Sequence, residues 1–233
     1  MAPKQKSSFK KFLIELVSVF LGVTLAFALN QWNEGRKNQR TQEKLLLELR
    51  NGLSMDLSDV RMNVMGHKIG IRSAEIMKKA CLENPLNQDS LLFAYKSLWR
   101  NFISIQNRSA YESLKSKGLE IINNDSLRNE IIALYDFHFE ILEKIEENYA
   151  EVQFYGNYFP KMQEQIAPYM IFDETGNIQG FIQPWQLKET QLKFMLEQLN
   201  RIAFNRQYLI NQYMEVDRRI ERLIKKLDKE IAK

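Results

Sequence analysis

The residues that could perform chemistry are few in this chain of 233 residues. Two histidines, His67 and His138, stand far apart, and neither falls in a spacing that a metal site or a catalytic triad requires. Cys81 is the single cysteine, so an internal disulfide is excluded and a small core residue is expected there rather than a nucleophile. The adjacent acids Glu146 and Glu147 would diverge by about 100° on a helix, which predicts a solvated face and not a shared substrate.

Motifs for catalysis are also missing from the sequence. It contains no phosphate-cradling glycine loop, no His-Glu-x-x-His pattern, no nucleophile elbow and no cysteine-histidine metal pattern. The formal charge of +4 comes from 33 basic and 29 acidic side chains that are interleaved along the chain, which is too mild a balance to indicate nucleic acid. We therefore expect a protein that is not an enzyme, uses no cofactor or metal and binds no nucleic acid.

Three polar side chains stand in apolar seams of predicted helices. His138 and Asn148 belong to a heptad pattern that begins after Asn124 or Asp125 and comprises Leu127, Ile131, Leu134, His138, Ile141, Ile145, Asn148 and Val152. His138 is expected to be a hydrogen-bonded core histidine, with a ligand or a pH-sensing group as the alternative. Arg206 is the only charged member of a second seam. If buried, it must meet an acid or backbone carbonyls, because an unpaired buried charge costs several kcal/mol.

The elements that carry these side chains are helices. Hydrophobic residues make up 45% of the chain, and only 9 glycines and 5 prolines occur, a composition typical of packed helices. From Pro184 onward neither Pro nor Gly appears, which predicts one long helix. Its seam steps regularly through Leu192, Met195, Leu199, Ile202, Arg206, Leu209, Tyr213, Val216, Ile220, Leu223 and Leu227.

Between the two heptad seams, residues 169–183 change pattern. An apolar triplet, an Asp-Glu-Thr-Gly-Asn run and a second apolar stretch predict a small hairpin or ordered loop at a bundle tip. A binding loop and a plain connector both fit this stretch.

Glycines and caps predict the other boundaries. A stalk is expected from Glu34 to about Met65, with bends possible at Gly35 and Gly52 and a break between Gly66 and Gly70. A helix should follow over residues 71–83. The next should begin at Asn87 or Asp89 and run to about Phe102.

Ser109-x-x-Glu112 reads as a capping box at the start of a short helix, which Gly118 would end.

The strongest signal is the N-terminal segment. Lysines at positions 4, 6, 10 and 11 precede an apolar run from Phe12 to Trp32, which as a helix would cover roughly 31 Å and match a bilayer core of about 30 Å. We expect a basic cytoplasmic tail over 1–11, a transmembrane helix over 12–33 anchored at the interface by Trp32, and an extramembrane bundle over 34–233. A cleaved signal peptide is the alternative, because Ala26-Phe27-Ala28 fits a cleavage site.

The charges flanking this segment bear on its orientation. Arg36, Lys37, Arg40 and Lys44 nearly cancel the lysine excess before it, but the leading tail contains no acid. We choose the N-terminus inside. The protein is then a single-pass protein of a bacterial inner membrane with its bulk in the periplasm.

One face of the membrane segment is narrow. Ser18, Gly22 and Ala26 recur every four residues, which predicts a transmembrane packing face against another helix. Glu15 is an intramembrane acid near that face. It is a functional proton or ion group, or it snorkels to the interface, or it pairs with Lys11.

Two stretches resemble a known family. Phe12-x-x-Glu15-Leu16-x-x-Val19-x-x-Gly22-x-x-x-Ala26 followed by Trp32-Asn33-Glu34, and Tyr111-Glu-Ser-Leu114-Lys-Ser-x-Gly118 with Ile122 and Leu127, are similar to uncharacterised single-span proteins of Bacteroidetes-type bacteria. The resemblance implies an N-terminal membrane helix, a helical domain and no assigned activity. It also implies that Glu15 and Gly22 belong to a characteristic membrane segment.

The sequence thus predicts an all-α protein with one N-terminal transmembrane helix that continues into a bundle of long, heptad-patterned helices. We expect a membrane-anchored interaction or scaffold protein, an accessory subunit of a cell-envelope complex. Its expected partners are membrane lipid and another membrane protein or its own copy. The alternative is an extracytoplasmic, sensor-like ligand-binding bundle that signals through a partner subunit. The basic last turns, from Asp217 on, suit either the helix dipole or anionic headgroups.

Overall fold

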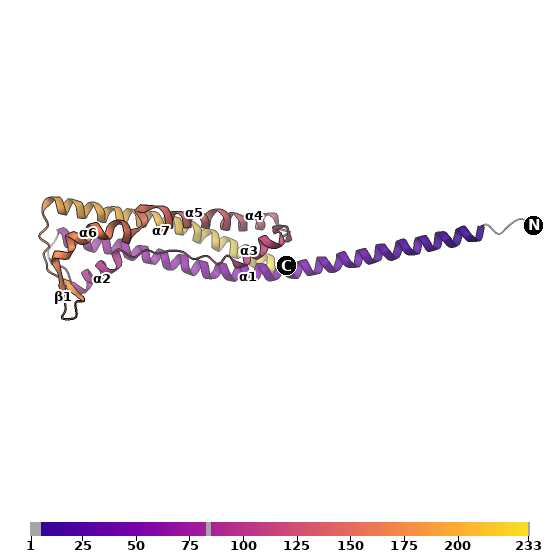
Figure 1. Ribbon diagram of the computed structural model, residues 1–233, viewed down its shortest axis with the longest axis horizontal. Helices are drawn as coiled ribbons and strands as arrows, with labels where there is room; N and C mark the ends of the chain where they lie inside the picture. Colours follow the sequence, from indigo (N-terminus) through magenta and orange to yellow (C-terminus); the bar gives the residue numbers. More distant parts are fainter. Residues whose placement is uncertain (1–5, 83–84, 233) are drawn as a thin grey trace, which may run out of the picture.

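A computed structural model describes residues 6–82 and 85–232, and within them the fold is all-α apart from one small hairpin. Two long helices organise it, α1 (Lys6–Leu82) and α7 (Glu189–Ile231). Figure 1 shows α7 lying along the second half of α1, while the first half of α1 extends beyond the bundle. The predicted all-helical class is confirmed.

The two long helices run antiparallel, and ion pairs fix their register. Arg50 Nε lies 3.0 Å from Asp228 Oδ1, and Arg61 Nε lies 2.7 Å from Asp217 Oδ2. The C-terminus therefore lies at the end of the bundle from which the free half of α1 emerges (Figure 1).

The predicted seam of α7 is confirmed almost completely. Its first member is half-buried, and the others are buried: Met195, Leu199, Ile202, Arg206, Leu209, Tyr213, Val216, Ile220, Leu223 and Leu227. The helix begins at Glu189 and not at Pro184. A sustained heptad period is enough to predict this buried face, because α7 is one uninterrupted helix that packs against the bundle with a single side.

The expected break between Gly66 and Gly70 is wrong, because α1 is one helix of 77 residues. These glycines serve packing instead of bending. A Cβ atom at Gly66 would overlap the Phe102 ring, and one at Gly70 would overlap the Arg206 side chain. Each glycine therefore admits a large neighbour against the helix backbone.

The predicted helix over residues 125–152 is divided. It consists of α4 (Asp125–Ala133), a π-helical turn η2 (Leu134–Phe139), α5 (Glu140–Asn148) and a 3₁₀ turn η3 (Ala150–Val152). The wider turn shifts the buried face, so the predicted seam is confirmed only in part after Leu134. Ile145 and Val152 are buried, but His138 is half-buried, Asn148 is exposed and Ile141 is 37% exposed. Phe139, Leu142 and Glu146 lie inside instead.

Shorter elements close the bundle. Helix α2 (Gln88–Leu98) and α4 have the expected caps, since the Asn87 side chain accepts from Ser90 N and that of Asn124 from Leu127 N. Helix α3 (Ser109–Lys117) ends at Gly118 with φ of 91°, as predicted. The Ser109 capping box is wrong, because α3 starts one position earlier, with Arg108 as its N-cap.

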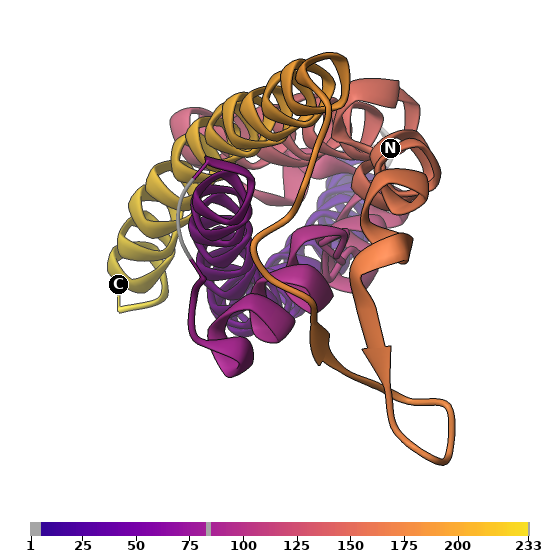
Figure 2. The same cartoon turned by 90° about the vertical axis from the view of Figure 1, so that its left-hand side faces the viewer.

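Between α5 and α7 the chain forms the remaining small elements. They are a π-helical turn η4 (Phe154–Tyr158), α6 (Phe159–Ile166), a 3₁₀ turn η5 (Ala167–Tyr169) and the strands β1 (Met170–Phe172) and β2 (Ile178–Phe181). A 3₁₀ turn η1 (Leu119–Ile121) lies earlier in the chain, between α3 and α4. The strands pair antiparallel, with Met170 opposite Phe181. Figure 2 shows this hairpin projecting from the side of the bundle.

Helix α2 ends at Leu98 and not near Phe102, and residues 99–108 then run without helix to α3. This connecting segment lies antiparallel along α1. Phe102 meets Gly66, Ile105 N donates to Asp59 Oδ2 at 3.3 Å, and Asn107 meets Gly52.

Candidate functional site

The first half of α1 has no packing partner within the protein. Every described side chain from Lys10 to Arg40 is exposed, and the core begins at Leu45. This part of α1 contains a stretch that is long and apolar enough to cross a membrane, and none of that stretch is buried. The segment predicted to be a transmembrane helix is thus a free, apolar helix.

The predicted packing face lies on this free helix. Ser18 Oγ donates to the carbonyl of Ile14 at 2.8 Å, so its hydroxyl is satisfied within the helix as an apolar environment requires. A Cβ atom at Gly22 would meet nothing within 4 Å. Internal packing therefore gives no reason for Gly22, in contrast to Gly66 and Gly70.

The two other predicted membrane residues flank this face. Trp32 is 62% exposed, and the Arg36 guanidinium carbon lies 5.0 Å from the centre of its ring. Glu15 is exposed near the start of the apolar stretch. Among the described side chains, Lys11 does not form an ion pair with Glu15, so the proposed pairing is not seen.

The outer side of α1 within the bundle is also apolar. Met55, Met62 and Met65 are 65%, 60% and 64% exposed, and they lie on the side of α1 opposite its buried residues. Ser58, at the centre of these methionines, stands about ten turns after Gly22 in an ideal helix. By this ideal period, the methionine face, defined as Met55, Met62 and Met65, would point in nearly the same direction as Gly22.

The polar residues of the bundle interior meet around residues 99–108. Arg206 is fully buried and donates to the carbonyls of Leu98 at 2.7 Å and Arg100 at 2.9 Å. Its guanidinium also lies over the Phe154 ring, 3.8 Å from the centroid. The expectation that a buried Arg206 meets carbonyls is confirmed. It caps the C-terminal end of α2, where the helix dipole favours a cation.

His67 completes the environment of Arg206, and sequence reasoning gave it no role. Its Nδ1 lies 3.1 Å from a guanidinium nitrogen. A guanidinium only donates, so Nδ1 must accept and the ring proton sits on Nε2. Burial, and then the Arg206 charge, lower the pKa of His67 to about 3. Burial lowers the pKa of Arg206 to about 9, which is still above neutral pH. At pH 7 the guanidinium is therefore charged, and the imidazole, with its lowered pKa, is neutral.

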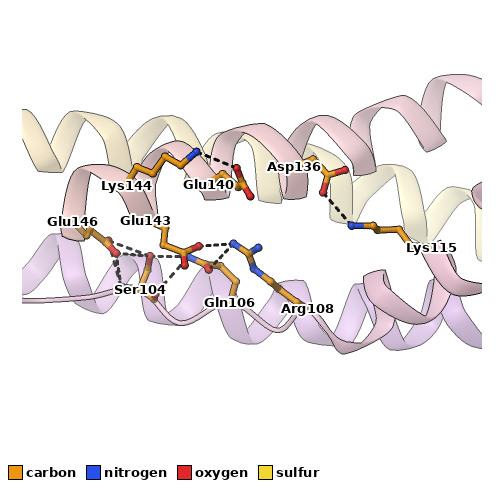
Figure 3. A network of polar contacts seen from close by, with 9 residues as sticks. All are labelled: Ser104, Gln106, Arg108, Lys115, Asp136, Glu140, Glu143, Lys144 and Glu146. Atoms are coloured by element: carbon orange, nitrogen blue, oxygen red, sulfur yellow. Dashed lines mark hydrogen bonds and ion pairs between the residues drawn. The ribbon is translucent and has the colours of Figure 1, made fainter. Parts of the chain in front are cut away.

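Carboxylates hold the other end of the segment (Figure 3). Glu146 is buried, which corrects the prediction of a solvated face, whereas Glu147 is exposed. The carboxylate of Glu146 accepts hydrogen bonds from Ser104 N at 3.2 Å, Ser104 Oγ at 3.1 Å and the Tyr213 hydroxyl. Burial raises the pKa of Glu146 above its usual range.

Two further carboxylates act beside it. Asp56 accepts from Asn107 N at 2.9 Å, and burial likewise raises its pKa. Glu143 pairs with Arg108 at 2.7 Å, as Figure 3 shows. Side chains from α1, α5 and α7 thus hold the connecting segment over residues 99–108 in place. These polar groups form their contacts with the backbone of that segment or with one another.

The remaining candidates for chemistry, Cys81 and His138, are buried or half-buried in the bundle. Cys81 is buried, and burial raises the pKa of its thiol to about 12, so it stays protonated. His138 is half-buried beside a cavity of about 80 Å³, and burial, followed by the charge of Arg219, lowers its pKa. In the part of the chain that the structure describes, no group of three His, Cys, Asp or Glu side chains could hold a metal ion.

Comparison with known proteins adds one match. No curated protein and no solved structure matches the chain. The model of a family of unknown function, DUF6090, matches residues 15–154. The matched region starts at Glu15, includes the 99–108 segment and ends at Phe154, whose ring lies against Arg206, and it covers more than half of the chain. The chain therefore belongs to the family of unknown function DUF6090.

Proposed function

We propose that this protein is a membrane-anchored helical interaction protein, an accessory subunit of a cell-envelope complex that acts through helix–helix contacts. Its partner is another membrane protein or a second copy of the chain. We place it as a single-pass protein of a bacterial inner membrane, with the N-terminus in the cytoplasm and the bundle in the periplasm. The observation that carries this proposal is the free half of α1, which is exposed from residue 10 to residue 40 and apolar from Phe12 to Trp32.

The small-residue face supplies the first support. In lipid there is little hydrophobic drive for helices to associate, so close backbone approach must supply the stability. Gly22 permits that approach and has no internal neighbour that explains it. Ser18 and Ala26, one turn away on each side, keep the same side of the helix narrow.

The methionine face supplies the second support. A helix that packs against Gly22 in the membrane and continues alongside α1 would meet Met55, Met62 and Met65 above it. Methionine suits such a contact because its unbranched, polarisable side chain adapts to different partners. One partner helix could thus be held both inside and outside the bilayer.

The filled interior makes us prefer this proposal to a ligand-sensing bundle. A sensor of that kind needs space among its helices for a small molecule. Between α1, α5 and α7 the centre is instead occupied by Arg206, Tyr213 and Phe154, each buried.

Substitution of Gly22 tests the proposal. Gly22→Leu should abolish assembly of the full chain, measured by cross-linking and light scattering in mild detergent, because leucine keeps the backbones apart. Leu21→Ala, about 100° around the helix, is the matched control and should assemble normally. Both variants should remain in the membrane fraction. Normal assembly of Gly22→Leu would contradict a contact through this face.

A further inference from the structure

A basic cleft lies where α1 leaves its apolar stretch. It has a volume of about 740 Å³ and is formed by one side of α1, from Asn33 to Glu48, and by the end of α3. Five cationic side chains line it: Arg36, Lys37, Arg40, Lys44 and Lys117. One carboxylate, Glu48, is present, and it pairs with Lys44 at 3.8 Å.

The other cations of the cleft have no carboxylate partner in the described part of the chain. Among the described residues, Arg36, Lys37, Arg40 and Lys117 form no ion pair within 4 Å, although most other arginines and many lysines of the bundle do so. Lys117 comes from a different element and still faces the same cleft. The cleft therefore concentrates positive charge that the protein itself leaves unneutralised.

The end of the cleft nearest the apolar stretch lies at the height of the headgroup layer of a bilayer. Arg36 follows Trp32 by four residues, about 6 Å along the helix axis, and Arg40 by about 12 Å. The polar layer on each side of a bilayer is about 5–8 Å thick. Side chains on a helix lean toward its N-terminus, which here means toward the membrane, so the Arg40 head can reach down into that layer.

The position of Arg36 agrees with this placement. Its guanidinium carbon lies 5.0 Å from the Trp32 ring centre, and an indole is at home at the membrane interface. Arginine also binds phosphate oxygens in a bidentate manner, which gives it an advantage over a simple point charge.

We propose that this cleft binds the phosphate group of an anionic membrane lipid, held by Arg36 and Arg40 of α1 and by Lys117 of α3. The inference rests on the proposed membrane anchoring of α1. A lipid bound there would tie the bundle to the bilayer surface and fix the angle between the membrane helix and the bundle.

Native mass spectrometry of the full-length protein tests the proposal. The protein is purified in micelles that contain equal amounts of phosphatidylglycerol and phosphatidylcholine. We expect retention of phosphatidylglycerol over phosphatidylcholine, and a loss of more than about tenfold in that preference for the double variant Arg36→Gln with Arg40→Gln. Lys117→Gln, a change on α3, should weaken the preference for phosphatidylglycerol severalfold. A charge effect confined to α1 would leave this variant unchanged.

The control removes the same charge from the same helix far from the cleft. Arg72→Gln with Lys79→Gln should retain phosphatidylglycerol as the unaltered protein does. The proposal is overturned if the unaltered protein holds both lipids equally, if this control loses as much, or if inorganic phosphate at the same concentration displaces the lipid. Membrane fractionation of every variant separates loss of the site from loss of the anchor.

Discussion

The guanidinium of Arg206 and the imidazole of His67 meet 3.1 Å apart in the interior of the bundle, where both side chains are fully buried. One comes from α7 and the other from α1, so their contact joins the two long helices at the level where α2 ends. Among the described residues no carboxylate pairs with Arg206, and its charge is stabilised by two carbonyls and a ring face. The buried polar groups Arg206 and His67 therefore serve to hold the helices together.

Replacement of Arg206 should therefore destabilise the bundle. Arg206→Leu leaves the carbonyls of Leu98 and Arg100 without their donor, at a cost of about 1–3 kcal/mol for the buried Leu98 carbonyl and less for the partly buried one of Arg100. We expect a marked loss in the free energy of unfolding, measured by urea titration of the full chain in mild detergent. Arg201→Leu, an exposed arginine on the same helix, is the control and should change stability little. Equal stability of both variants would show that the capping of α2 is unimportant.

The same contact predicts a pH dependence. The pKa of His67 in the folded protein is about 3, against an ordinary value of about 6.5. Between these values the unfolded chain binds a proton at His67 that the folded chain does not, so the free energy of unfolding falls as the pH falls. His67→Asn keeps an oxygen acceptor for Arg206 and does not titrate.

We expect His67→Asn to lose less stability than the unaltered protein between pH 7 and pH 4, as measured by urea titration at each pH. The carboxyl groups of Glu146 and Asp56 have raised pKa values and act in the opposite direction, but they are common to both proteins. Identical pH profiles would mean that His67 is protonated in the folded state.

Substitution of three glycines of α1 by alanine should change the stability of the protein in two different directions. Gly66→Ala and Gly70→Ala should destabilise the bundle, because the new methyl group overlaps Phe102 or Arg206. Gly35→Ala should raise stability by up to about 1 kcal/mol, since nothing lies within 4 Å of its Cβ position and alanine favours the helix. Thermal melts in detergent measure all three. A stabilised Gly70→Ala would contradict the close packing of Arg206.

These glycines show where sequence reasoning reaches its limit. The regular seam of α7 can be predicted from the sequence because its buried positions lie along one long neighbour, α1. Gly66 and Gly70 carry the same local signal as a helix break, and only Phe102 and Arg206, distant in sequence, reveal their role. A glycine therefore indicates either a bend or a close contact, and the pattern alone does not separate them.

The buried polar groups were missed for a related reason. The divergence of Glu146 and Glu147 on a helix predicts a solvated face for both, but Glu146 is buried. The π-helical turn at Leu134–Phe139, which shifts the buried face of α5, has no clear sequence signal. His67 had no metal or triad spacing, and its partner lies on the other long helix. By contrast, the free apolar stretch of α1 that contains Gly22 could be predicted, because a stretch of this kind depends on local composition alone.

The central claim is that the N-terminal part of α1 stays attached and anchors the protein in a membrane. The most direct test is the intact mass of the protein recovered from the membrane fraction of its native cells. We predict a mass that includes the segment from Phe12 to Trp32, in a form that alkaline carbonate does not extract. A shortened species that begins at Leu29 and is found in the soluble periplasm would contradict the claim.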